Sequence, residues 1–250
     1  MNQNKKFIFI SGLHRSGTSL LYKILKKQKN ISGLSNTNEL EDEGQHVQTV
    51  FEPAFNFGGV GKFGFDINAR LDERSKLIND KNKIKLFNEW KRYWDLEKEY
   101  LLEKSPPNII RTRFLQSMFP NSYFINITRH PIATSLATKK WSKTSLNSLI
   151  NHWITCHKIF EKDSKEIKNI INIKYEDLIN NTDEVLKSIS IFINLEIKNT
   201  TEEIRTGIND KYFSKWRKLS KSIFSKIQIQ KITEKYNKEV MHFNYNLKDF

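Results

Sequence analysis

Two glycines, Gly12 and Gly17, bracket a short segment whose residue types could bind an anion. The loop between them carries one cation, Arg15, and the hydroxyl residues Thr18 and Ser19 follow it directly. A loop that leads into a helix aims several backbone N–H groups and the positive end of the helix dipole at one anion. The segment therefore predicts a phosphate-binding loop.

The residues on either side of this loop predict the strand and the helix that such a site requires. Residues 7–10 are all apolar and indicate a short buried strand. After the loop, apolar residues recur at helical spacing, which places them on one buried face: Leu20, Leu21, Ile24 and Leu25. The loop is thus expected to join a strand to the first turn of a helix.

The spacing of the two glycines matches the Walker A loop of nucleoside triphosphatases, but the residue types differ. Thr18 stands where that motif has the lysine that reaches the outer phosphates. Arg129 follows the predicted strand at 123–127, where the Walker B aspartate would be expected. These two differences argue against hydrolysis of ATP or GTP.

Three further predicted strands, at 100–102, 123–127 and 170–175, each end in a polar cluster. The clusters are Glu103-Lys104-Ser105-Pro106, Arg129-His130-Pro131 and Tyr175-Glu176-Asp177-Leu178. In a doubly wound α/β fold the ligand binds at the carboxyl ends of the strands. These clusters and the phosphate loop are therefore expected to meet in one site.

The rest of the chain predicts strands that alternate with helices. Residues 30–65 are expected to be irregular because Asn, Ser and Gly are frequent there. Further helices are predicted at about 106–119, 132–141, 148–160, 181–193 and 222–245, with one or two between 72 and 97. The sequence predicts an α/β fold of three layers, a parallel sheet flanked by helices of the P-loop nucleotide-binding type, with residues 1–250 forming one domain.

Composition narrows the classes of partner and the compartment. The net charge of +14 favours anionic partners, although many of the lysines are expected on solvated helix faces. The only cysteine, Cys156, is expected to be a buried small hydrophobe, so no disulfide can form within the chain. The first strand leaves no room for a signal peptide and no apolar run could span a membrane, so a cytoplasmic protein is expected.

The run Gly-Leu-His-Arg-Ser-Gly-Thr-Ser at 12–19 resembles the 5′-phosphosulfate loop of sulfotransferases that use 3′-phosphoadenosine 5′-phosphosulfate (PAPS). The three strand-end clusters resemble other segments of that family, in the style of its glycan, tyrosine and bacterial members, so the resemblance covers most of the chain. It implies transfer of a sulfuryl group from PAPS to a hydroxyl or amine, with release of 3′,5′-adenosine diphosphate and without a metal ion.

The resemblance also implies roles for individual residues. Arg129 would grip the 3′-phosphate, Tyr175 would lie near adenine, and Lys104 would supply positive charge to the sulfuryl transfer. The 5′ end of the nucleotide would be held by the loop residues His14, Arg15, Ser16, Gly17, Thr18 and Ser19.

The chain departs from the family pattern at two places. The family usually has a serine eight positions after the phosphate-binding arginine, but residue 137 is alanine, so Ser135, Thr134 or Thr138 would have to supply that hydroxyl. A C-terminal Arg-Lys-Gly segment is also absent. Residues 211–218, with Lys215 and Arg217, are expected to close over the nucleotide instead, unless they form a basic helical turn with two core aromatics.

The acceptor's proton requires a base, and the acidic segment at 39–46 offers several candidates. Glu43 is the first candidate and His46 the second, with Glu39 and Glu41 beside them. A solvated acidic loop is the alternative interpretation of this segment.

Two other classes of function remain open from the sequence. A small-molecule kinase would account for the phosphate loop but not for Thr18, and a polyanion or nucleic-acid binding module would account for the charge but has no recognition motif. No nucleic acid is therefore expected as a partner. Saccharides, peptidyl tyrosines, lipids and small alcohols are all open as acceptors, because acceptor choice depends on loops such as 30–65.

Overall fold

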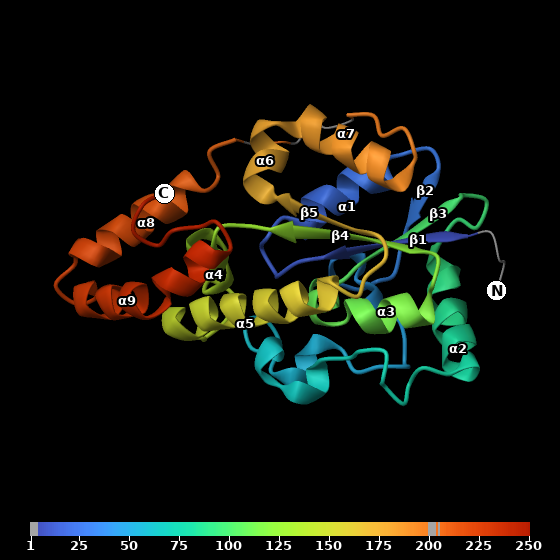
Figure 1. Cartoon of the computed structure of the whole chain (residues 1–250), viewed down its shortest axis with the longest axis horizontal. Helices are drawn as coiled ribbons and strands as arrows, with labels where there is room; N and C mark the ends of the chain where they lie inside the picture. The colour runs from blue at the N-terminus through green and yellow to red at the C-terminus, as the bar shows by residue number, and fades with distance from the viewer. Residues whose placement is uncertain (1–4, 200–203, 205) are drawn as a thin grey trace.

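A five-stranded parallel sheet forms the centre of the molecule, seen in a computed structural model that describes residues 5–199, 204 and 206–250 (Figure 1). The strands lie in the order β2-β3-β1-β4-β5. Their bounds are β1 Lys6–Ser11, β2 Ile31–Gly33, β3 Tyr100–Lys104, β4 Ser122–Thr128 and β5 Ile170–Lys174. From the central β1 the chain goes first to one side, for β2 and β3, and then to the other. This reversal leaves a crevice at the carboxyl ends of the strands.

The apolar run of β1 is buried on both faces, as a parallel sheet between two helical layers requires. Ile8 and Ile10 pack in a cluster with Leu21 of α1, whereas Phe7 and Phe9 point to the other face and pack with Phe114 of α3. Successive side chains of a strand point to opposite faces, so this unbroken run serves two cores at once.

Helices cover both faces of the sheet (Figure 1). The helices α1, α6 and α7 lie over one face, and α3, α4 and α5 lie over the other, with α2 at the β2 and β3 side. Their bounds are α1 Thr18–Lys26, α2 Asp80–Trp90, α3 Thr112–Met118, α4 Pro131–Thr138, α5 Leu146–Ser164, α6 Tyr175–Asn180 and α7 Thr182–Ile193. The predicted three-layer α/β class is confirmed.

A helical hairpin, α8 (Asp210–Lys221) and α9 (Lys226–His242), extends beyond the end of the sheet toward which the strands point (Figure 1). Trp216 of α8 and Ile229 of α9 are buried in the same cluster as Ile132 of α4, which fixes the hairpin to the body. In the described part of the chain, no helix combines the length and the apolar character needed to cross a bilayer.

Several predicted elements have different bounds in the structure. Residues 31–33, inside the segment expected to be irregular, form β2, because their backbone pairs with Tyr100–Leu102 of β3. The sequence does not predict this strand, because three residues are too few to show a hydrophobic period. The predicted helix at 106–119 begins as a 3₁₀ turn, Pro106–Ile110, before α3. Residues 210–221 form a full helix, and the Tyr175 cluster is the first turn of α6.

Candidate active site

The phosphate loop joins β1 to α1 and depends on glycine at both of its ends. Gly17 has φ 107°, and a Cβ there would lie 2.5 Å from the ring of Tyr175. Gly12 has φ 150°, and a Cβ there would lie 2.5 Å from the carbonyl oxygen of Ile127. Any side chain at either position would push away β4 or α6. The glycines therefore allow the loop to touch the two neighbouring strand ends.

The loop contains a buried hydroxyl two residues before the start of α1. The Oγ of Ser16 is buried and has no hydrogen-bond partner among the described residues. The N–H of Ser16 closes a turn with the carbonyl of Leu13, and α1 begins two residues later at Thr18. A helix N-terminus carries unpaired N–H groups and a partial positive charge. The free hydroxyl and the helix start suit an anion.

Arg129 lies at the end of the neighbouring strand β4 and contacts both the loop and α8. Its Nη1 donates to the carbonyl of Arg15 at 2.8 Å, and its Nε donates to Oδ1 of Asn209 at 2.8 Å. Its guanidinium lies 4.3 Å above the ring of Tyr175. The remaining Nη2 is buried without a partner among the described residues, and burial lowers the pKa of Arg129. One donor group of a buried cation is thus left for a ligand.

The carboxylate of Glu176 accepts hydrogen bonds from three residues around Arg129 and so fixes their positions. Its Oε1 accepts from the N–H of His130 at 3.0 Å and from Nδ2 of Asn209 at 2.7 Å. Its Oε2 accepts from the hydroxyl of Tyr245 at 3.0 Å. The sequence did not identify Asn209 as a site residue, because only the fold brings it from 80 positions away to Arg129.

Glu43 and Lys104, predicted from separate segments, form an ion pair. Lys104 Nζ donates to Glu43 Oε1 at 3.1 Å, and Lys104 is fully buried. Gln45 Nε2 donates to Glu43 Oε2 at 2.6 Å, and His46 Nε2 lies 3.8 Å from the same oxygen. The structure therefore brings together the two base candidates and the predicted cation. Gln45 is a site residue that the sequence did not single out.

A second carboxylate, Glu103, fastens the loop that carries Glu43. Its Oε1 accepts from the N–H of Gly44 at 3.0 Å and from Oγ of Ser105 at 2.5 Å, and Asn108 donates to its Oε2 at 2.6 Å. Gly44 has to be glycine, because a Cβ there would lie 2.6 Å from the Glu103 side chain. Burial raises the pKa of Glu103 to about 7. This network sets the position of Glu43 relative to β3.

A cleft of about 660 Å³ connects these groups, which is within the usual range for a small-molecule site. One half is formed by the phosphate loop and strand ends, and includes Arg15, Thr18, Arg129, Thr138, Tyr175 and Tyr212. The other half is formed by residues 40–60 and includes Leu40, Glu43, Gln45, His46, Phe55 and Val60. Lys104 lies behind Glu43 rather than on the lining.

The apolar residues at the cleft are exposed. Leu40 is 82% exposed, Phe55 79% and Trp141 73%. The guanidinium of Arg15 lies 5.3 Å from the ring of Trp141. Large side chains that line a cleft and remain in contact with water provide apolar area to a bound molecule.

His14 also lines this cleft and is held neutral. Burial lowers the pKa of His14 to about 4. Its Nδ1 has no hydrogen-bond partner among the described residues, and its ring packs edge-on against Phe63 at 5.9 Å. The side chain can therefore accept or donate a hydrogen bond without carrying charge.

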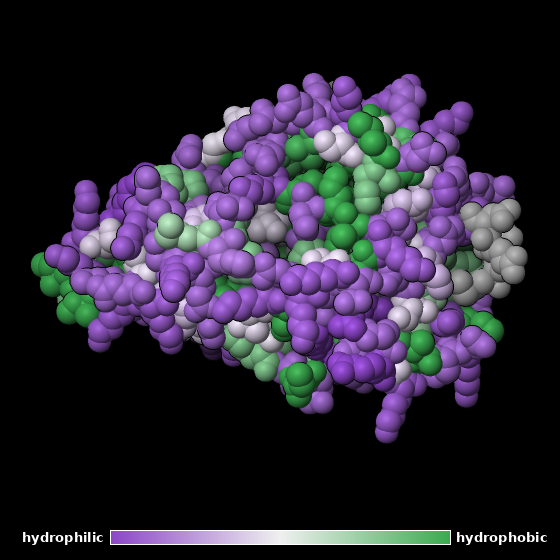
Figure 2. Space-filling view, in the orientation of Figure 1, coloured by the Kyte–Doolittle hydropathy of each residue, from purple (hydrophilic) through white to green (hydrophobic). Residues whose placement is uncertain are grey.

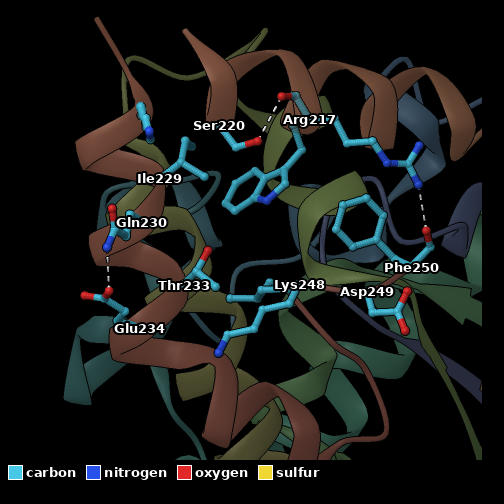
Figure 3. Close-up of a pocket in the computed structure, with 12 residues that line it drawn as sticks. Arg217, Ser220, Ile229, Gln230, Thr233, Glu234, Lys248, Asp249 and Phe250 are labelled. Carbon is cyan, nitrogen blue, oxygen red and sulfur yellow. Dashed lines mark hydrogen bonds between the residues drawn. The ribbon is translucent and has the colours of Figure 1, made fainter. Parts of the chain in front are cut away.

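Four of the predicted cofactor residues do not line the cleft, and one of them is Ser16 of the phosphate loop itself. Ser135 borders a separate small cavity with His14, and its Oγ has no partner among the described residues. Lys215 is exposed on α8, and Arg217 borders a cavity between α8 and α9, where it donates to the carbonyl of Phe250 (Figure 3). At the cleft itself, the lining residues closest in sequence to these predictions are Thr138 of α4 and Tyr212 of α8, with Lys211 beside Tyr212.

The site combines a phosphate loop that lacks the Walker lysine, a buried arginine one strand away, and a paired carboxylate across the cleft. Together these features define a P-loop-type group transferase. The comparisons narrow this class. A model of the sulfotransferase family matches residues 8–199. The chain therefore belongs to the sulfotransferase family, whose members are PAPS-dependent transferases.

Solved sulfotransferase structures share this fold at low sequence identity. The sulfotransferase domain of the Synechococcus PCC 7002 olefin synthase is 16% identical, with 98% of each chain covered and a TM-score of 0.56. The sulfotransferase domain of the curacin biosynthetic pathway is 16% identical over 92% of this chain and 97% of its own, with a TM-score of 0.53. STF1 of Mycobacterium tuberculosis H37Rv is 14% identical over 84% and 77%, with a TM-score of 0.52. No curated protein matches the chain.

Proposed function

We propose that this chain transfers a sulfuryl group from PAPS to a hydroxyl in the cleft described above. Family membership implies PAPS as the donor. The observation that carries the proposal for this chain is the unpartnered, buried Nη2 of Arg129, which lies one strand away from the phosphate loop and is tied to it through the carbonyl of Arg15. PAPS differs from ordinary adenine nucleotides in its 3′-phosphate, so it needs a second anion site of this kind.

The residues of the cleft fit the nucleotide. The loop N–H groups and Thr18 would hold the 5′ end, together with the unpartnered hydroxyl of Ser16 inside the loop, and Arg15 would neutralise it. Arg129 would hold the 3′-phosphate, and its Nη2 would gain the partner that it lacks. Tyr175, whose ring packs on Gly17, would lie against the adenosine.

Thr138 is our candidate for the hydroxyl that the alanine at 137 cannot supply. It lines the same cleft as Arg129 and lies in the last turn of α4, whereas Ser135 borders the separate small cavity. Lys211 and Tyr212, in the first turn of α8, are our candidates for the part of the predicted closing segment that faces the nucleotide.

Glu43 is our candidate for the general base. Its carboxylate would accept the acceptor's proton as the acceptor oxygen bonds to sulfur and the bond from sulfur to the 5′-phosphate oxygen breaks. The leaving oxygen takes the electron pair of that bond. Lys104 pairs with Glu43 and places positive charge at the same end of the cleft, and Arg15 and the loop stabilise the charge on the leaving phosphate.

The apolar rim indicates the kind of acceptor. Leu40, Phe55 and Trp141 are exposed at the cleft, so we propose an acceptor whose hydroxyl is carried on an apolar or aromatic body. A peptidyl tyrosine or a hydrophobic alcohol fits this rim better than an unsubstituted saccharide, because burial against these side chains would contribute to its binding.

Two measurements test this function. 3′,5′-Adenosine diphosphate is expected to raise the melting temperature with or without magnesium, and more than ATP does. Incubation with radiolabelled PAPS is then expected to label a tyrosine peptide, an aryl alcohol or a long-chain alcohol in preference to a disaccharide. Greater stabilisation by ATP with magnesium would instead favour a small-molecule kinase, although this chain has Thr18 where the Walker motif of such kinases has a lysine.

A further inference from the structure

The turn between α8 and α9, together with the first turn of α9, presents three large apolar side chains to solvent at the far end of the hairpin. Phe224 is 99% exposed, Ile223 90% and Ile227 66%. Figure 2 shows a hydrophobic patch at this end of the molecule, bordered by hydrophilic residues. These side chains do not line the cleft, so the proposed sulfuryl transfer does not account for them.

The turn is ordered by its own hydrogen bonds. The N–H of Lys226 donates to the carbonyl of Ser222 at 2.8 Å, and Oγ of Ser225 donates to the carbonyl of Leu219 at 2.7 Å. Below the turn, Trp216 and Ile229 pack in the core. The apolar residues therefore project from a fixed support, and little conformational entropy would be lost if they entered another phase.

The part of the hairpin nearest this apolar turn is basic. Between Lys211 and Thr233 the chain has six lysines and one arginine, and no aspartate or glutamate. All seven cationic residues are exposed, and none of the six lysines forms an ion pair with any residue that the structure describes. This surface therefore carries a net positive charge that is not neutralised within the molecule.

We propose that this hairpin docks on an anionic lipid bilayer, with Ile223, Phe224 and Ile227 inserted into the interface and the lysines against the headgroups. An apolar tip in a basic, amphipathic setting is the composition that binds such surfaces. A nucleic acid would match the charge but offers no apolar phase for three aliphatic and aromatic side chains. A second copy of this chain would bring the same positive charge and be repelled.

The docked surface lies close to the cleft. Tyr212 lines the cleft and α8 ends at Lys221, so nine residues of helix, about 14 Å at 1.5 Å per residue, separate the cleft from the turn. The hairpin would thus hold the cleft beside the bilayer without a membrane-spanning segment.

Sedimentation with vesicles tests this proposal on the full chain. We expect binding to phosphatidylcholine vesicles that contain about one third phosphatidylserine and little binding to phosphatidylcholine alone, because the lysines act on anionic lipid. The paired variant Ile223→Ser with Phe224→Ser should bind the anionic vesicles ~10²-fold more weakly, because it no longer buries two large apolar side chains. Ile191→Ser, which removes an isoleucine that is 73% exposed on α7, is the matched control and should bind like the parent.

Further measurements separate the alternatives. Both serine variants should melt at the parent's temperature, since the replaced side chains are exposed. Equal vesicle binding by the paired variant and the parent would overturn the proposal, because it would show that the lysines alone bind the vesicles, as they would bind any polyanion. A dimer that forms without vesicles, and that the paired variant abolishes in sedimentation equilibrium, would also overturn it and assign the turn to a second copy of the chain.

Discussion

The ammonium group of Lys104 lies 3.1 Å from the carboxylate of Glu43, in a position with no exposed surface. Lys104 ends β3, and Glu43 belongs to the loop after β2, so the pair joins two neighbouring strand ends across 61 residues. A buried charge that loses its partner is costly. The two residues therefore support the fold and the chemistry at the same time.

A double-mutant cycle should reveal this coupling. We expect Lys104→Met and Glu43→Gln each to lower the free energy of unfolding by about 3 kcal/mol, because each leaves the other member of the pair as an unpaired charge. The double variant should lose less stability than the sum of the two single variants. Urea unfolding of the four proteins measures the interaction. Strict additivity would show that the pair does not hold the loop to the strand.

Lys104→Met should also lower turnover by ~10²-fold or more, on the scale of one lost electrostatic contact in the transition state. Affinity for 3′,5′-adenosine diphosphate should change less, since Lys104 does not line the cleft. Radiolabelled transfer and calorimetric titration measure the two effects. Normal turnover in a folded variant would remove Lys104 from the mechanism.

Glu43→Gln and His46→Asn separate the two base candidates. Glu43 is held by Lys104 and Gln45, whereas His46 is only near the carboxylate at 3.8 Å. We therefore expect Glu43→Gln to be nearly inactive and His46→Asn to keep most of its turnover, because only the first loses the proton acceptor. Similar activity in both variants would direct the search to other carboxylates of the loop.

Arg129→Ala should weaken binding of 3′,5′-adenosine diphosphate by about 2–3 kcal/mol, the scale of a charge-assisted contact. Binding of 5′-AMP should hardly change, because that ligand lacks the 3′-phosphate. Isothermal titration with both ligands gives the comparison. Equal losses would mean that Arg129 acts on the fold or the 5′ end through its bond to the Arg15 carbonyl.

Thr138→Val and Ser135→Ala form a matched pair for the 3′ end. We expect Thr138→Val to weaken binding of 3′,5′-adenosine diphosphate by about 1 kcal/mol, the net value of one hydrogen bond. Ser135→Ala should bind normally, because Ser135 borders a different cavity. The reverse result in calorimetric titration would restore Ser135 as the phosphate-binding hydroxyl.

Buried histidines should make the protein sensitive to acid. Burial lowers the pKa values of His14, His130 and His157 to about 4 and that of His152 to about 3. Each is protonated at a higher pH when unfolded, so its contribution to stability is full above about pH 6.5 and is lost as the pH falls toward 4. Glu103, with its raised pKa, acts in the opposite direction between about 4.5 and 7.

His152→Gln isolates one member of this group. His152 is 3% exposed, and its Nε2 accepts from the N–H of Gly64 at 3.1 Å, which a glutamine oxygen can also do. Between about pH 7.5 and pH 5 the variant should lose about 2 kcal/mol less stability than the parent. Urea unfolding at the two pH values measures the difference, and an unchanged difference would show that His152 is charged in the folded protein.

The sequence predicted the site residues that lie next to a strand end or a helix start in the chain. Gly12 directly follows β1 and Gly17 directly precedes α1, so their spacing was enough to predict a phosphate loop. Arg129 directly follows β4, and the resemblance to sulfotransferases added it as a second anion site at the same sheet edge. The fold class followed from the same alternation of strands and helices, and β2 was missed because its pairing with β3 is a tertiary contact.

The supporting residues could not be predicted in the same way. Asn209 and Glu103 act through partners that are distant in sequence or through buried hydrogen bonds, which leave no periodic signal. In α8, Lys211 faces the cleft and Lys215 does not, and only the docking of the helix decides which turn of a basic helix meets the ligand. In the same way, only the packing of α4 decides that Thr138 lines the cleft and that Ser135 does not.

The bond from Arg129 Nη1 to the carbonyl of Arg15 has a thermodynamic consequence. Arg15 has φ 69°, a backbone conformation that is unfavourable for a residue with a side chain. Because a buried guanidinium holds that carbonyl, the conformational cost of shaping the loop falls on folding rather than on ligand association. The loop should accordingly be preorganised, and the affinity for the nucleotide should be limited by desolvation of the charged groups more than by ordering of the protein.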